Sequence, residues 1–60
     1  MNKWFNGVKN SDVGNNCKVS GTRGKIIAVD TAGKYCTIRN NNGTVHEQLR
    51  SNVDVSREIK

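Results

Sequence analysis

Short apolar runs alternate with polar punctuation over most of this chain, from Val19 to Val55. Runs of four to six residues, rich in β-branched side chains, are separated by Gly, Asn and Asp. This pattern is typical of short antiparallel strands joined by tight turns. It predicts an all-β protein with five strands, over residues 16–20, 25–30, 35–40, 44–49 and 53–55.

The predicted strand over residues 25–30 breaks strict alternation, because it is apolar at every position from Ile26 to Val29. Such a strand is either covered on both faces or bent by a bulge that switches its parity. Before it, Gly21 and Gly24 are expected to bracket a tight turn that needs positive φ angles. Further on, Asn42-Gly43 predicts a two-residue hairpin turn of type I′.

The predicted strand over residues 44–49 alternates cleanly. Val45, Glu47 and Leu49 share one face, and His46 lies on the other. We expect the face with the two apolar residues to cover the core and His46 to face solvent as an ordinary surface residue. A catalytic dyad of His46 and Glu47 is not expected, since the two side chains point in opposite directions.

Three segments follow from this pattern: an N-terminal arm over residues 1–15, a barrel over residues 16–56 and a C-terminal tail over residues 57–60. The arm is rich in Asn, Gly and Ser and sustains neither a strand nor a helix period. It carries Trp4 and Phe5, at least one of which we expect to plug an open end of the barrel. The alternative is an exposed ring that stacks on a base or on a partner side chain.

Sixty residues allow one domain with a thin core. The chain is 33% apolar and 25% charged, which is typical of neither a membrane protein nor a clearly disordered one. No apolar run approaches the roughly 18 residues that span a bilayer, and no segment reads as a signal peptide. We therefore expect a cytoplasmic protein without a membrane partner.

Two cysteines, Cys17 and Cys36, are too far apart in sequence for a C-x-x-C motif. With His46 as the single histidine they do not make a zinc ligand set. We expect two partly buried thiols on neighbouring strands, and the alternative is a disulfide in a secreted domain. The sequence also lacks a phosphate-binding loop and a nucleophile elbow, so we expect no enzyme, no cofactor and no metal.

The formal net charge of +5 is unevenly distributed. Residues 18–39 carry five basic residues against Asp30 alone, whereas residues 40–60 are neutral overall. A concentrated basic patch indicates binding to a phosphate backbone, since neutralised phosphates release condensed counterions. The alternative is that the charge keeps a small protein soluble and protects its sheet edges.

The candidate nucleic-acid contacts all lie in this basic segment, around the first two hairpins. Tyr35 and Arg39 share strand parity, so they are expected to project from one face about 13 Å apart. That spacing suits an aromatic platform beside a phosphate contact. The candidate residues are Lys18, Arg23, Lys25, Lys34, Tyr35 and Arg39.

Five strands with a one-turn 3₁₀ link at residues 50–52 before the last one are the pattern of a small SH3-like barrel. Within it, Gly24-Lys25-Ile26-Ile27-Ala28-Val29-Asp30 resembles the KOW motif of NusG-type transcription elongation factors and several ribosomal proteins, in which strand residues follow a Gly as G-x-V-x-x-V. The preceding residues 19–23 look like the basic turn that leads into that motif. Residues 43–49 and Val53 are similar to the closing strands of those barrels.

The resemblance covers about residues 17–55. It implies a binding module of the transcription or translation machinery that contacts RNA, DNA or protein through its loops. Only Gly24 carries over from the motif, in a structural role. Our first hypothesis is therefore a basic nucleic-acid-binding module. The alternative is a protein-interaction module that docks on RNA polymerase, a ribosome or a regulatory protein, and we expect a monomer or a weak homo-oligomer.

Overall fold

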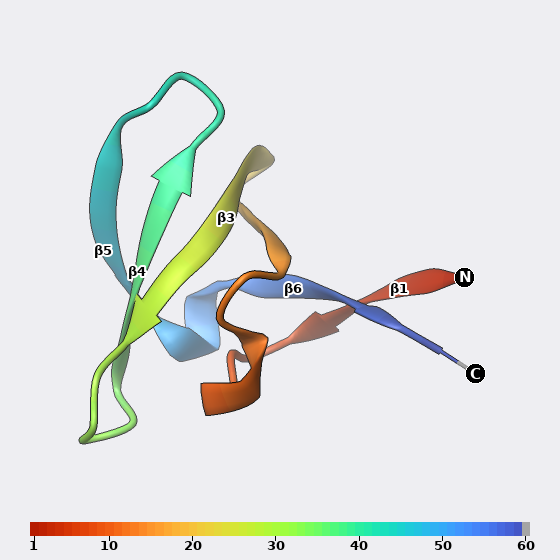
Figure 1. Ribbon diagram of the computed structural model, residues 1–60, viewed down its shortest axis with the longest axis horizontal. Coiled ribbons are helices and arrows are strands. Elements are labelled where there is room, and N and C mark those ends of the chain that lie inside the picture. The colour runs from red at the N-terminus through yellow and green to blue at the C-terminus, as the bar shows by residue number, and fades with distance from the viewer. Residues whose placement is uncertain (60) are drawn as a thin grey trace.

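A computed structural model describes residues 1–59, which form one antiparallel sheet and two short 3₁₀ turns, η1 and η2 (Figure 1). The order of strands across the sheet is β1-β6-β2-β3-β4-β5. The all-β prediction is confirmed, and so is the 3₁₀ turn before the last strand. The elements are β1 (Asn2–Asn6), η1 (Asn10–Asp12), β2 (Asn16–Val19), β3 (Thr22–Val29), β4 (Tyr35–Asn40), β5 (Val45–Leu49), η2 (Arg50–Asn52) and β6 (Asp54–Glu58).

The sheet is open: β1 and β5 are its two edges, and within residues 1–59 they do not pair with each other. The structure also has a sixth strand, because the predicted irregular arm contributes β1. All five residues of β1 are exposed, so its sequence lacks the alternation of apolar and polar residues that predicts a half-buried strand. The strand exists because it pairs along its whole length with β6, which itself extends into the predicted tail at residues 57–60. Lys60 lies outside the described residues.

The hydrophobic core is small. Its residues come from β2, β3, β4 and β6 and from Val8 and Val53 beside them, and β1, whose residues are all exposed, contributes none. Val19 and Val29 pack against it and are partly buried. Each fully buried aliphatic side chain contributes about 1.5 to 3 kcal/mol, so polar contacts matter in a core of this size. The buried residues are Val8, Cys17, Ile26, Cys36, Ile38, Val53 and Val55.

Strand β3 contains a bulge, which confirms the second of the two expectations for its apolar run. Ile26 lies opposite Ile38 on β4, but the next paired residue is Ala28, opposite Thr37. The extra residue, Ile27, is exposed. A bulge of this kind bends the strand and increases the local twist, which helps a single sheet to wrap around a core.

Gly24 does not belong to a turn, contrary to the prediction. It is buried inside β3, where a Cβ atom would lie 2.7 Å from the carbonyl oxygen of Arg39. The turn instead consists of Ser20 and Gly21, with φ angles of 50° and 82°, as a two-residue type I′ hairpin requires. Glycine at position 24 is therefore needed because β3 and β4 approach closely, and not for a positive φ angle.

The hairpin between β4 and β5 is also longer than predicted. The N–H of Gly43 donates to the carbonyl of Asn40 at 2.9 Å, and the N–H of Asn40 donates to the carbonyl of Thr44 at 2.8 Å. These two bonds enclose a loop of three residues, 41–43, instead of the two-residue turn. The side chain of Asn42 accepts a hydrogen bond from the N–H of Thr44 at 3.0 Å, which orders the loop from within.

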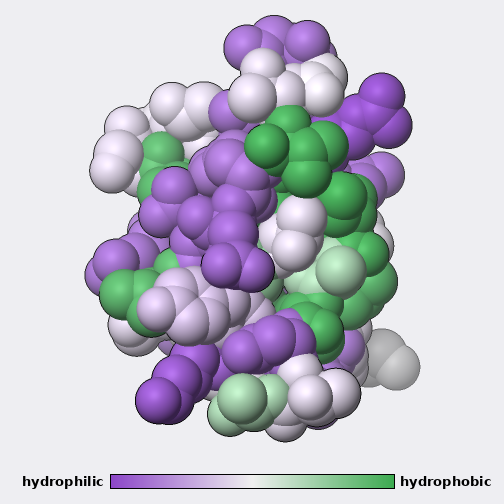
Figure 2. All heavy atoms as spheres, turned by 90° about the vertical axis from the view of Figure 1, so that its left-hand side faces the viewer, coloured by the Kyte–Doolittle hydropathy of each residue, from purple (hydrophilic) through white to green (hydrophobic). Residues whose placement is uncertain are grey.

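The two faces of β5 are the reverse of the prediction. Val45 and Leu49 are 54% and 40% exposed, whereas His46 and Gln48 lie half-buried on the core side. The ring of His46 is hydrogen-bonded to Asn40 at 2.9 Å and to Gln48 at 3.0 Å, which satisfies polar groups at the margin of the core. Figure 2 shows the outer side, where hydrophobic residues gather along one edge beside a hydrophilic area.

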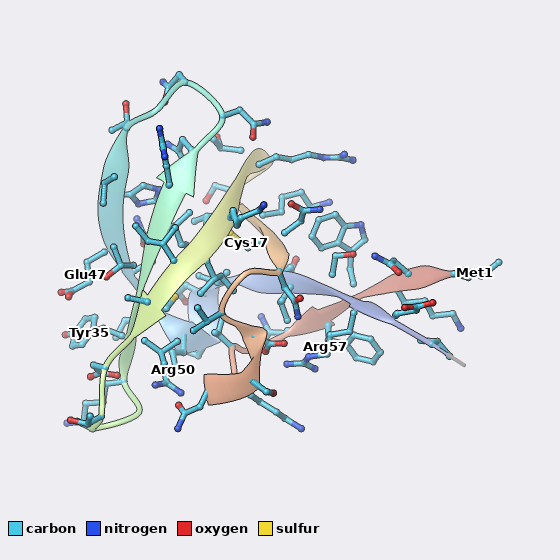
Figure 3. The ribbon with its side chains drawn as sticks, viewed as in Figure 1. Met1, Cys17, Tyr35, Glu47, Arg50 and Arg57 are labelled. Atoms are coloured by element: carbon cyan, nitrogen blue, oxygen red, sulfur yellow. The ribbon has the colours of Figure 1, made fainter. Side chains whose placement is uncertain are left out.

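Two arginines fasten the η1 segment to the sheet, and both side chains are directed towards it (Figure 3). Arg57 donates to Asp12 from Nε at 2.8 Å and from Nη2 at 2.6 Å. Arg50 donates from Nη1 to Asn10 at 2.8 Å and from Nη2 to the carbonyl of Asp30 at 2.5 Å. Both guanidinium groups are thus committed to structural bonds.

Candidate nucleic-acid interface

Four of the six predicted contact residues project from one face of β2, β3 and β4. The alternation of the strands decides this, because their neighbours Cys17, Gly24, Ile26 and Ile38 are buried and the residues between them must point outward. We call this surface the basic face. It consists of Lys18, Arg23, Lys25 and Arg39.

Strand register arranges these four basic residues in two cross-strand pairs. Lys18 lies directly opposite Arg23, and Lys25 lies directly opposite Arg39. Residues opposite one another in an antiparallel pair have Cβ atoms about 4.5 to 5.5 Å apart. Arg23 and Lys25 are two residues apart on β3, which separates the two pairs by about 7 Å. The sequence predicted the residues but not this pairing.

No residue of the basic face takes part in an ion pair within residues 1–59, where the ion pairs are Arg50–Asp30 and Arg57–Asp12. Two acidic residues lie on strands that flank the face. Asp54 on β6 lies opposite Lys18, and Glu47 lies on the outer side of β5. Like charges directly opposite one another destabilise a sheet. Lys18 faces Arg23 on one side and Asp54 on the other, whereas Lys25 and Arg39 face each other with no acidic residue opposite either of them.

Trp4 borders the basic face from β1, although β6 lies between β1 and β2 in the sheet. The Nζ atom of Lys18 lies 4.7 Å from the centroid of the indole, and the Cζ atom of Arg23 lies 5.7 Å from it. Trp4 pairs with Ser56, a small residue that leaves room for the ring to reach across β6. Both distances fall within the range of cation–π attraction.

The expectation that Trp4 or Phe5 plugs an open end of a barrel is wrong, since the sheet is open and both rings are partly exposed. The two residues are 40% and 37% exposed. Phe5 lies beside Arg57, whose Cζ atom is 5.2 Å from the ring centroid. Nothing local in the sequence could have placed Trp4 beside the basic face, because the pairing of β1 with β6 joins residues about fifty positions apart.

Lys34 and Tyr35 lie apart from the basic face. Lys34 is exposed in the turn between β3 and β4, and Tyr35 begins β4, four residues before Arg39. Tyr35 does share the outer face with Arg39, as predicted, and projects from the same side as Glu47 (Figure 3). Its direct neighbour is the exposed Leu49. This end of the face is therefore apolar and not basic.

The two cysteines are free and fully buried in the core. They lie on β2 and β4, which are separated by β3, so the expectation of neighbouring strands is wrong. Burial raises the pKa of the Cys17 thiol to about 11, and it also raises the pKa of Cys36. Because the thiolate is the reactive form of cysteine, these thiols are inert in the folded chain.

Residues 1–59 enclose no pocket and contain no group of three or more His, Cys, Asp or Glu side chains placed to hold a metal ion. Over the same residues, no helix has the length and apolar character needed to cross a bilayer. Comparison of the chain with protein-family models, with curated proteins and with solved structures finds no match.

Proposed function

We propose that this chain is a non-enzymatic nucleic-acid-binding module that holds the phosphate backbone on its basic face. The observation that carries the proposal is the pairing of like charges, Lys18 with Arg23 and Lys25 with Arg39. A phosphate bound over either pair neutralises two cations at once and removes a repulsion from the folded protein. At Lys25 and Arg39, which have no acidic residue opposite them, an anionic ligand therefore supplies a countercharge that the strand pairing does not.

The face has the form that backbone binding needs. It is an open strand surface, so a long polyanion can lie across it without entering a pocket. Neutralisation of up to four phosphates predicts a plot of log affinity against log salt with a slope of about −3. Such contacts fix position but read no sequence, so we expect little preference among base sequences.

The proposal extends to an SH3-like, KOW-like module of the cytoplasmic transcription or translation machinery. Strands β2 to β6, with η2 before the last one, keep the element order expected of an SH3-like barrel. Gly24, the glycine of the KOW-like segment, supports the proposal because it lets β3 approach the backbone of Arg39. The open sheet with an added β1 would then be a variant of that barrel.

The test is a salt titration of binding to duplex DNA, single-stranded DNA and RNA of equal length. We expect the triple variant Arg23→Ala, Lys25→Ala, Arg39→Ala to lose at least about tenfold in affinity and to reduce the salt slope by about 2 to 3. The matched control removes the same charge outside the basic face, at Lys3, Lys9 and Lys34. Equal losses in both variants, binding that ignores salt, or no binding at all would each reject the proposal.

A second candidate function is a protein-interaction module that docks on transcription or translation machinery or another regulatory partner. The observation that favours it is the apolar end of the outer face, where Tyr35 and Leu49 lie directly opposite each other and both are about 40% exposed. It predicts one dominant protein partner that persists after nuclease treatment. The double variant Tyr35→Ser, Leu49→Ser should lose that partner, and the triple variant of the basic face should retain it.

A further inference from the structure

The single tryptophan of the chain stands outside the hydrophobic core. The core is built from seven small and medium-sized side chains, while the largest apolar side chain is 40% exposed on an edge strand. Burial of a tryptophan is among the largest hydrophobic contributions available to a small protein. A chain with so thin a core therefore leaves part of a large stabilising contribution unused at this position.

The surroundings of the ring supply a reason for its exposure. Lys18 and Arg23, which lie opposite each other on β2 and β3, both approach the indole of Trp4, at 4.7 Å and 5.7 Å from its centroid. A base stacked on the exposed part of the ring would have its phosphate within reach of these two flexible side chains. The second pair of the basic face, Lys25 and Arg39, lies about 7 Å further along β3, where the next phosphates would follow.

We propose that Trp4 is a base-stacking platform at the margin of the basic face, so that the ligand is single-stranded nucleic acid. This inference rests on the nucleic-acid-binding function proposed above. An aromatic side chain can stack on a base only when that base is free of its own helical stack, which is the case in single strands and loops. In a duplex the bases are stacked on one another and leave only the phosphates for contact.

The binding step exchanges one set of contacts for another. In the free protein the indole holds Lys18 and Arg23 by cation–π attraction. When the strand binds, both cations form charge-assisted hydrogen bonds with phosphate, which are stronger, and the ring is released to the base. Because Trp4 is the single tryptophan, its fluorescence reports this exchange without a label.

A comparison of two ligands tests the inference: a homopolymeric single strand of about 12 nucleotides and a blunt duplex of equal length. We expect wild-type protein to bind the single strand more tightly, with quenching of Trp4 fluorescence that saturates with the affinity. Trp4→Leu should weaken single-strand binding by about tenfold or more and change duplex binding less than about twofold. Trp4→Phe keeps a ring and should retain most of the single-strand affinity.

Phe5→Leu is the matched control, because Phe5 is the neighbouring residue, is almost equally exposed and also lies beside an arginine. It should leave both affinities unchanged. Thermal unfolding of each variant establishes that it is folded. If Trp4→Leu fails to fold, the wild-type quenching and the Trp4→Phe affinity decide the matter.

Two failures can be told apart. If both ligands bind equally well, without quenching and without an effect of Trp4→Leu, the stacking inference is overturned and backbone binding by the basic face stands. If wild-type protein binds neither ligand, the proposed function itself fails. A purely structural role for the indole predicts equal losses of affinity for the two ligands, and that result also overturns the inference.

Discussion

The guanidinium of Arg57 holds the carboxylate of Asp12 in a two-pronged hydrogen bond, at 2.8 Å and 2.6 Å, across 45 positions of sequence. Asp12 is 1% exposed, and it also accepts hydrogen bonds from the N–H of Lys9 and the side chain of Asn15. This one buried carboxylate thus gathers the segment around η1 and ties it to β6. In a protein with so small a core, the tie should account for a large part of the stability.

Removing the guanidinium should destabilise the fold strongly. We expect Arg57→Met to lower the free energy of unfolding by about 3 kcal/mol, because Asp12 is left as a buried charge without its partner. A domain of this size has about 3 to 9 kcal/mol in total. Lys3→Met is the matched control, since Lys3 is directly opposite Arg57 on β1 and has no ion pair within residues 1–59. Urea unfolding followed by circular dichroism measures both, and equal effects would contradict the assigned role.

Acid should weaken the same contact in a defined pH window. The hydrogen bonds from Arg57 lower the pKa of Asp12 from 3.8 to about 2, against the opposing effect of burial. A lowered pKa stabilises the folded state at every pH above the unfolded value. That stability, about 2 kcal/mol here, is lost as the pH falls from about 4 to 2.

Urea unfolding between pH 7 and pH 2 measures this loss. In Asp12→Asn the part of the pH dependence that belongs to Asp12 should be missing, while the part that belongs to Asp30 should remain. The pKa of Asp30 is lowered too: burial opposes the shift, and the N–H groups of Tyr35 and Lys34 and the nearby Arg50 produce it. An unchanged pH profile in Asp12→Asn would show that Asp12 does not titrate as described.

Gly24→Ala should destabilise the chain by about 2 kcal/mol or more. The new Cβ would lie 2.7 Å from the carbonyl oxygen of Arg39 and 2.9 Å from a methyl group of the buried Ile38, and neither can move without separating β3 from β4. Thr22→Ala, an exposed position on the same strand, should change stability by less than about 0.5 kcal/mol. Thermal unfolding of the two variants makes the comparison.

The basic face predicts opposite effects on stability and binding. Lys25→Glu replaces a like-charge pair with Arg39 by an opposite-charge pair, so we expect the fold to gain about 0.5 kcal/mol and its Tm to rise by about 3 °C. The same substitution should weaken nucleic-acid binding and lower the salt slope by at least about 1. Lys34→Glu makes the same charge change in an exposed turn and should do neither. A loss of both stability and binding in Lys25→Glu would mean that this face is not strained by its charges.

Most strands were predictable because they are local in origin. The β-branched runs predicted β2, β4 and β5 to within one residue at each end, and the 3₁₀ turn at residues 50–52 was found in place, but β3 begins at Thr22, three residues before its predicted start. Strand β1 was not predictable, since its residues are all exposed and its partner is at the other end of the chain. The prediction of which face of β5 points to the core was wrong for a related reason, namely that the position of the strand in the sheet decides it. At the edge of a small core, hydrogen-bonded His46 and Gln48 take the inner side and leave Val45 and Leu49 outside.

The composition of the candidate site was accessible from charge alone, but its geometry was not. Strand register brings together Lys18, Arg23, Lys25 and Arg39, and the positions of the turns determine that register. The predicted turn at Gly24 would have given a different register. Conversely, no sequence pattern distinguished Arg50 and Arg57, yet they hold η1 in place. Whether a basic side chain is free to bind a ligand or makes structural hydrogen bonds depends on tertiary contacts, which a local sequence pattern does not contain.

The pairing of β1 with β6 also places the two ends of the described chain side by side, since the N–H of Ile59 donates to the carbonyl of Met1 at 2.8 Å. Both ends lie at the tip of the ribbon that extends away from β3, β4 and β5 (Figure 1). A polypeptide that enters at one end and leaves at the other therefore spans almost no distance. The domain has the geometry of an insert, which a surface loop of a host protein can carry without being stretched.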